Sequence, residues 1–244
     1  MLVLGLETST ARSSIALVDR DGVVASASLG VPRRHGEFLA PAIAFCCEQA
    51  GVRPDQVTGV AVGLGPGLYT GLRVGIATAQ TFAAARRLPV VGLSGLDVVA
   101  FEARYVRRLL CVALDARRGE VFHAFYRAAP GGVQRQGELR VGRPETLVAE
   151  IEAAGEDVLV LGDAAVTYRA LLEGPGVELA GPEVAAPDAA VLAELAVPRF
   201  EREETGRPED LRPIYLRQAD ARIGWEQRGR LRGGEAPDAA EPPA

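Results

Sequence analysis

The chain has 244 residues, of which 48% are hydrophobic and 24% are charged, and this composition excludes an intrinsically disordered protein. Its formal charge of −5 comes from 32 acidic and 27 basic residues, so a broad cationic face for a nucleic acid is excluded. A direct RNA-binding module remains an alternative only as a weak, salt-sensitive contact through paired arginines such as Arg86–Arg87 and Arg107–Arg108. Every basic residue is an arginine. Chemistry that needs a lysine ammonium group, such as a Schiff base or a Walker A phosphate loop, is therefore excluded as well.

The few histidines and cysteines do not have the spacing of a zinc site, since His35 and His123 are far apart and Cys111 stands alone. Adjacent Cys46 and Cys47 in an odd set of cysteines indicate reduced, buried thiols of the cytosol. The apolar start is too short for a signal segment, and glycines interrupt the longest uncharged stretch. We expect a soluble cytoplasmic protein that has no contact with membranes.

The first half of the chain predicts three strands followed by alternating helices and strands. Apolar runs predict the strands, a tight turn at Asp21–Gly22 joins two of them, and apolar residues at helical spacing predict the helices. The expected elements are strands Leu2–Leu6, Ser13–Asp19 and Val23–Leu29, helix Glu37–Ala50, strand Val57–Leu64, helix Thr70–Ala85, strand Pro89–Leu93 and helix Leu96–Arg104.

The second half repeats this order. Two βββαβαβα units in tandem predict an α/β fold of two similar lobes with a cleft between them. We expect one lobe over residues 1–105 and a smaller one over 106–222, and a disordered tail over 223–244, which is rich in glycine, proline and charge. The expected elements are strands Leu109–Leu114, Glu120–Arg127 and Val133–Val141, helix Pro144–Ala154, strand Val158–Leu161, helix Ala164–Glu173, strand Val177–Ala180 and helix Pro187–Phe200.

A glycine-rich segment, Gly63–Arg73, joins a predicted strand to a predicted helix. It fits neither a Walker loop nor the dinucleotide fingerprint. Gly65 and Gly67 allow a sharp turn, and Thr70 can cap the helix, whose free N–H groups suit an anion. The alternative is a turn that only connects the strand to the helix.

A row of small residues at four-residue spacing follows on this helix: Gly71, Gly75, Ala79 and Ala83. Such a row lets a second helix approach closely. The second helix is either Glu37–Ala50 of the same chain or part of another protein that docks on the outer side. The spacing alone leaves both alternatives open.

Two acidic residues, Glu7 and Asp115, occupy matching places after the first strand of each half. Paired carboxylates at strand ends can hold a metal-bound phosphate across a cleft, and Arg117 and Arg118 can bind an anion nearby. The alternative for all four is a solvated charged turn. His35, at the front of a helix, can contact a partner or cap the helix.

Four segments together resemble the TsaB family: Leu4–Thr10, Arg34–Glu37, Gly65–Arg73 and Leu114–Val121. The segment Pro213–Arg217 near the end resembles it as well. That family is the bacterial dimerisation subunit of the machinery that makes threonylcarbamoyladenosine in transfer RNA. The resemblance implies an actin-like, sugar-kinase-like (ASKHA) fold of two tandem ribonuclease-H-like lobes. It also implies pairing with the catalytic subunit TsaD through the first two helices, the ATPase TsaE as a third member, a homodimer when alone, and only indirect contact with tRNA.

The resemblance implies a non-catalytic role in forming N6-threonylcarbamoyladenosine at position 37 of tRNAs that read ANN codons. Catalytic relatives hold a metal with two histidines four residues apart, and here Leu39 stands four residues after His35. We therefore expect no catalytic residue, no metal and no cofactor of its own, with a nucleotide at the partner interface left open. The alternative is an ATP-dependent phosphotransferase or a glycoprotease-like hydrolase of the same superfamily, using Glu7 and Asp115.

Two sets of site residues follow from the resemblance and the helical patterns. The expected partner interface consists of His35, Phe38, Leu39, Ala42, Ile43, Cys46, Gly71, Leu72, Gly75, Ala79 and Phe82. The expected contacts for an anion or a nucleotide are Thr8, Ser9, Gly65, Gly67, Thr70, Arg73, Asp115 and Arg118.

Overall fold

A computed structural model describes residues 1–32 and 34–217 of the chain, and the predicted tail over 223–244 lies outside these residues. The first sheet is mixed, with strand order β3-β2-β1-β4-β5. Strands β1, β2 and β3 are antiparallel neighbours, whereas β1, β4 and β5 run parallel. The strands are β1 (Val3–Glu7), β2 (Ser13–Asp19), β3 (Gly22–Leu29), β4 (Gly59–Gly63) and β5 (Val90–Leu93).

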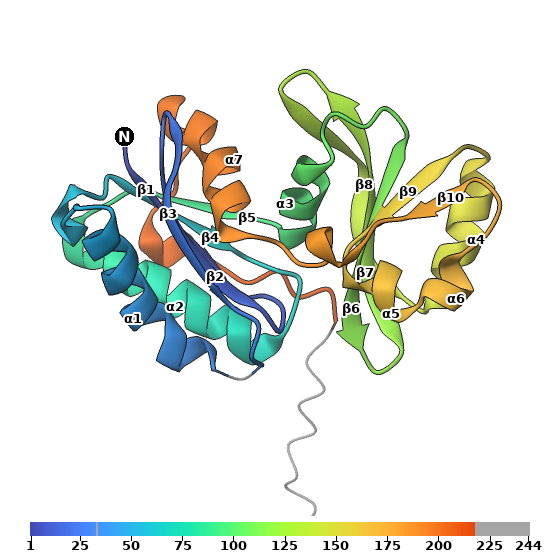
Figure 1. Cartoon of the computed structure of the whole chain (residues 1–244), viewed down its shortest axis with the longest axis horizontal. Helices are drawn as coiled ribbons and strands as arrows, with labels where there is room; N and C mark the ends of the chain where they lie inside the picture. The colour runs from blue at the N-terminus through green and yellow to red at the C-terminus, as the bar shows by residue number, and fades with distance from the viewer. Residues whose placement is uncertain (33, 218–244) are drawn as a thin grey trace, which may run out of the picture.

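The second sheet repeats this topology with strand order β8-β7-β6-β9-β10. Its strands are β6 (Leu109–Arg117), β7 (Glu120–Ala129), β8 (Gly132–Gly142), β9 (Val158–Leu161) and β10 (Val177–Leu179). Each sheet forms one lobe of the molecule (Figure 1). The predicted α/β fold, actin-like and built from two ribonuclease-H-like lobes, is confirmed.

Two helices, α1 (His35–Gln49) and α2 (Tyr69–Arg86), cover one face of the first sheet. Alternate residues of a strand point to the same face, and so Leu4 and Leu17 pack in one buried cluster with Leu39 and Ile76. Burying one stripe of each helix against the sheet leaves the opposite stripe exposed.

The other face of the first sheet is covered by α7 (Ala189–Glu201), which comes from the second half of the chain. Val3 and Val18 pack there against Leu192 and Phe200. The boundary at residue 105 remains a prediction, and the packing of α7 means that residues 1–105 do not bury both faces of the first sheet by themselves.

Helix α3 (Gly95–Glu102), which comes from the first half of the chain, packs in turn against the second sheet. Leu96 and Val99 are buried with Leu110, and the hydroxyl of Tyr126 donates a hydrogen bond to Asp97 Oδ1 at 2.8 Å. Helices α3 and α7 also contact each other between the sheets. Each sheet is therefore covered on one face by a helix from the other half of the chain, and these packing contacts hold the two lobes together.

The outer face of the second sheet is covered by α4 (Pro144–Ala154), α5 (Asp163–Thr167) and α6 (Arg169–Leu172). The expectation of one helix over Ala164–Glu173 is wrong, because Tyr168 has φ −109° and ψ 25°, outside the helical region, and divides α5 from α6. Helix α5 packs on β6, whereas α6 packs on α4.

The described chain ends in an extended segment, residues 211–217, that passes from the first lobe to the second. The backbone N–H of Ile214 donates to Leu64 O at 2.8 Å, and Arg217 forms an ion pair with Glu120 on β7. This segment therefore forms part of the boundary between the lobes. Short 3-10 helices at Pro54–Gln56, Pro182–Val184 and Pro208–Asp210 complete the described structure.

Candidate functional site

Most residues of the predicted partner interface are buried inside the first lobe. Nine of them form the inner stripes of α1 and α2, namely His35, Leu39, Ala42, Ile43, Cys46, Gly71, Leu72, Gly75 and Ala79. The other two, Phe38 and Phe82, are partly buried against the same core. These stripes face the sheet of their own lobe, so another protein meets the opposite stripes first.

The small-residue row on α2 lets the loop after β1 lie against the helix. A Cβ atom added to Gly71 would overlap the carbonyl oxygen of Thr8, and one added to Gly75 would overlap Thr8 Oγ1. The hydroxyl of Thr8 donates to Gly71 O at 2.8 Å in this buried contact. Of the two alternatives that the spacing left open, the intramolecular one accounts for this row.

His35 also has an internal role in this structure. Its Nδ1 lies 2.6 Å from Ser13 Oγ, and the side chain is 4% exposed. Burial lowers the pKa of the imidazole, because the low-dielectric interior disfavours the charged form. The neutral ring therefore holds the start of α1 against β2.

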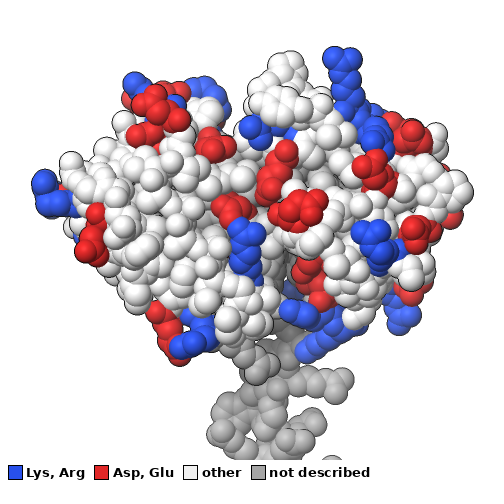
Figure 2. Space-filling model, in the orientation of Figure 1, with Lys and Arg blue, Asp and Glu red and all other residues white. Residues whose placement is uncertain are grey.

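A second row of small residues lies on the exposed side of the same two helices. On α1 this row is Gly36, Ala40 and Ala44, and on α2 it is Ala77 and Thr81, all exposed and spaced by four. Figure 2 shows that the surface over these helices is mostly uncharged, with acidic and basic groups at its margins. The four-residue spacing of this row is present in the sequence as well, but these residues were not among those predicted for the partner interface.

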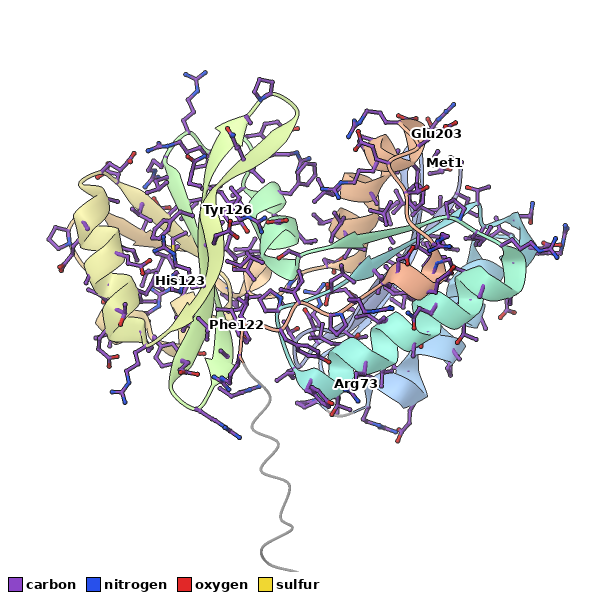
Figure 3. All side chains as sticks on the ribbon, turned by 180° about the vertical axis from the view of Figure 1, so that it is seen from behind. Met1, Arg73, Phe122, His123, Tyr126 and Glu203 are labelled. Atoms are coloured by element: carbon purple, nitrogen blue, oxygen red, sulfur yellow. The ribbon has the colours of Figure 1, made fainter. Side chains whose placement is uncertain are left out.

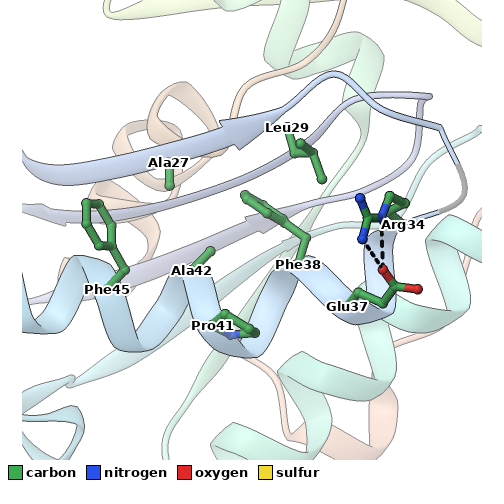
Figure 4. Close-up of a pocket in the computed structure, with 8 residues that line it drawn as sticks. All are labelled: Ala27, Leu29, Arg34, Glu37, Phe38, Pro41, Ala42 and Phe45. Carbon is green, nitrogen blue, oxygen red and sulfur yellow. Dashed lines mark hydrogen bonds and ion pairs between the residues drawn. The ribbon is translucent and has the colours of Figure 1, made fainter.

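A groove of about 390 Å³ lies between α1 and the edge strand β3 (Figure 4). Its walls are mainly apolar, and an ion pair closes one end, where Arg34 Nη2 lies 2.8 Å from Glu37 Oε2. Phe45, at the other end, is 53% exposed. The groove continues the uncharged face of α1 toward the edge of the sheet.

Glu7 is fully buried at the end of β1 and has few partners. Its Oε1 accepts a hydrogen bond from the backbone N–H of Ser9 at 2.6 Å, whereas Oε2 has no hydrogen-bond partner. Burial raises the pKa of this carboxyl, since desolvation outweighs the hydrogen bonds to the charged form. The glycine-rich loop folds over this end of the strand, and Leu68 N donates to Ser9 O at 2.7 Å. Glu7 therefore does not face an open cleft.

Asp115 has its own local partners at the matching position of the second lobe. It accepts from Arg117 N at 2.8 Å and pairs with the Arg117 guanidinium at 3.0 Å. Its backbone N–H donates to Asp163 Oδ1 at 2.7 Å, and burial raises the pKa of Asp163. These contacts brace the β6–β7 turn.

A cleft of about 590 Å³ opens between the lobes, beside the start of α2 and the β6–β7 turn. Of the predicted anion contacts, Gly67 and Arg118 line it, and Arg73 lies beside it on α2. Thr8, Ser9 and Gly65 are buried elsewhere, whereas Thr70 is exposed at the start of α2. Residues 214–217 form another wall, and the sequence, in which this segment resembles the TsaB family, predicted no part in the site for it.

Residues 1–32 and 34–217 contain neither a cluster of metal ligands nor a membrane-spanning helix. No group of three or more His, Cys, Asp or Glu side chains is arranged there to hold a metal ion. No helix of this part of the chain combines the length and the apolar character needed to cross a membrane.

These features define a two-lobed α/β protein of the actin-like, sugar-kinase-like class, with an uncharged helical face and a cleft lined by arginines. The family model described as TsaD, tRNA N6-adenosine threonylcarbamoyltransferase, matches residues 22–225. The chain belongs to this family and is a TsaB/YeaZ-type protein within it.

Similar proteins cover nearly the whole chain. The tRNA threonylcarbamoyladenosine biosynthesis protein TsaB of Escherichia coli is 29% identical, over 93% of this chain and 98% of that protein. TsaB of Bacillus subtilis is 27% identical over 92% of this chain and 98% of its own length. A Pseudomonas aeruginosa structure described as similar to peptidase YEAZ has a TM-score of 0.77 and 30% identity, covering 88% of this chain and 99% of that one.

Proposed function

We propose that this chain serves in the formation of N6-threonylcarbamoyladenosine at position 37 of tRNAs that read ANN codons, as the non-catalytic partner of a TsaD subunit. Relatives that match over most of their length carry the name of this biosynthesis, and the matching family model is that of the transferase. We further propose, from the family resemblance of the sequence, that the TsaE ATPase joins the pair and that the chain alone forms a homodimer. We expect the protein to act in the cytoplasm.

The observation that carries the proposal is the exposed face of α1 and α2. Small side chains at four-residue spacing on both helices, Gly36, Ala40, Ala44, Ala77 and Thr81, allow two further helices to approach closely. The face is mostly uncharged, so little desolvation of charge opposes its burial. A pair of helices from the catalytic subunit fits this surface as the other half of a four-helix bundle.

The state of Glu7 supports a non-catalytic role. The carboxyl of Glu7 is fully buried, and desolvation raises its pKa, which disfavours the charged form. It is also covered by the loop that contains Leu68. Such a group is poorly placed to bind a metal-bound phosphate, which needs exposed anionic oxygens.

Charge placed on the exposed face tests the docking surface. Ala40→Arg and Ala77→Arg each put a guanidinium where the bundle excludes water, and an unpaired buried charge is strongly unfavourable. We expect each variant to bind purified TsaD at least tenfold more weakly by calorimetry. The matched control is Ala153→Arg on the exposed side of α4, in the other lobe. Parent-like affinity in folded Ala40→Arg and Ala77→Arg proteins would contradict this surface.

A separate assay tests the absence of catalysis. The purified chain is incubated with ATP, and phosphate release is compared with that of Glu7→Gln, which replaces the carboxyl by an isosteric amide. We expect no turnover above background from either protein. Turnover by the parent that disappears in Glu7→Gln would support the phosphotransferase alternative.

A further inference from the structure

The cleft between the lobes has a wall of exposed aromatic rings. Tyr69 and Tyr215 stack with their ring centroids 5.8 Å apart and planes 27° from parallel, and each is about half exposed. The Arg73 guanidinium lies 4.0 Å from the centre of the Tyr69 ring. Figure 3 places Arg73 and Phe122 on opposite sides of the gap between the lobes. Tyr215 and Arg73 contact the Tyr69 ring, and the exposed half of the two tyrosines leaves part of this aromatic surface open to solvent.

The opposite wall is cationic and has an unusual backbone. Arg117 and Arg118, in the β6–β7 turn, have φ values of 63° and 58°, in the left-handed region that favours glycine. This conformation is unfavourable for a residue that carries a Cβ atom. The turn therefore holds two consecutive guanidinium groups beside the cleft at a cost in stability. Figure 2 shows basic side chains gathered at the lower end of the second lobe.

The chemistry of the lining favours one kind of ligand. Among residues 1–32 and 34–217, the cleft is lined by Arg117, Arg118 and Arg217 together with aromatic and aliphatic side chains, and no carboxylate, side-chain amide or aliphatic hydroxyl of these residues lines it. Asp115 and Glu120 pair with Arg117 and Arg217 from outside the lining. The guanidinium groups and the aromatic rings together favour an anionic ligand that carries flat rings. Stacking surfaces beside arginines bind single-stranded nucleic acid without reading its bases.

We propose that this cleft binds an unpaired stretch of RNA, with a base on the Tyr69–Tyr215 wall and its phosphates on Arg117 and Arg118. The proposal rests on the proposed function only in naming RNA as the strand. It departs from the indirect contact with tRNA that the family resemblance implies, because it has this subunit contact the RNA substrate directly, at a surface separate from the α1–α2 docking face. Because the whole chain carries a net charge of −5, the contact is weak and depends strongly on salt.

Fluorescence anisotropy with a labelled, unstructured eight-nucleotide RNA and the full chain at low salt tests this proposal. We expect saturable binding that weakens as salt rises. Tyr215→Ala removes a stacking ring and is expected to weaken binding at least fivefold, whereas Tyr215→Phe keeps the ring and the affinity. Arg118→Ala is expected to weaken binding and flatten the salt dependence.

Matched controls and competing outcomes make the test decisive. Tyr105→Ala removes an exposed tyrosine that also contacts an arginine, Arg104, but lies outside the cleft lining, and Arg53→Ala removes an exposed arginine of the first lobe. Both are expected to bind like the parent. Equal loss in these controls, absence of binding, or binding of AMP as tight as that of the oligonucleotide would each overturn the proposal. TsaD binding is measured separately with the same variants, so failure of the docking face is distinguishable from failure of the cleft.

Discussion

The contact between α2 and the loop after β1 predicts a specific sensitivity at Gly75. In Gly75→Ala the new methyl group overlaps Thr8 Oγ1 and displaces the hydroxyl that donates to Gly71 O at 2.8 Å. Overpacking costs about 1–3 kcal/mol, and the lost buried hydrogen bond costs about 1 kcal/mol. The higher helix propensity of alanine offsets about 1 kcal/mol of this loss. The expected net loss in the free energy of unfolding is therefore about 1–3 kcal/mol.

Thermal unfolding measures this loss, which corresponds to a melting temperature lower by about 3–10 °C in a protein of this size. The control is Gly36→Ala, the same substitution on the exposed side of α1, where the new methyl group contacts nothing beyond its chain neighbours and the backbone of its own helix; no loss is expected. In a Thr8→Ala background both the overlap and the hydrogen bond are already gone, and Gly75→Ala should then cost about 2–4 kcal/mol less. An equal cost in both backgrounds would refute the overlap as the cause.

Three further predictions concern buried polar groups. Burial raises the pKa of Glu102 to about 7; the folded state then binds more protons than the unfolded state between pH 4.5 and 7, so stability falls as pH rises through this range. Allowing for its partial exposure, Glu102→Gln should gain about 1–2 kcal/mol over the parent at pH 8 and little at pH 4.5, by urea unfolding. Ser13→Ala leaves the buried His35 Nδ1 without its partner and should lower stability by about 1–3 kcal/mol in the same assay. Tyr126→Phe removes the hydrogen bond to Asp97 and should cost about 1 kcal/mol; unchanged unfolding midpoints would contradict each of the last two.

Local sequence patterns predicted most elements well, because hydrophobic periodicity reflects which side of a strand or helix is buried. The bounds of Ser13–Asp19, Pro144–Ala154 and Val158–Leu161 agree with β2, α4 and β9. The prediction of one helix over Ala164–Glu173 was wrong. The break at Tyr168 lets α5 pack on β6 and α6 pack on α4, and the spacing of apolar residues does not show such a break.

The candidate site was predicted only in part. The sequence identified the two helices, but it selected their inner stripe, because small residues at four-residue spacing occur on both sides of α2 and only the position of Thr8 distinguishes them. The exposed rows on α1 and α2 were equally visible in the sequence. The cleft depends on residues 214–217, which are remote in sequence from Tyr69 and Arg117.

The sequence by itself determined the order of strands and helices, the duplication of the two halves and the classes of chemistry that a chain without lysine cannot perform. These are properties of local pattern and of composition. Only the tertiary structure decided that α7 covers the first sheet, that Glu7 is buried and that Tyr69 and Tyr215 meet. Each of these depends on contacts between segments far apart in the chain, where the burial of one segment is decided by the packing of another.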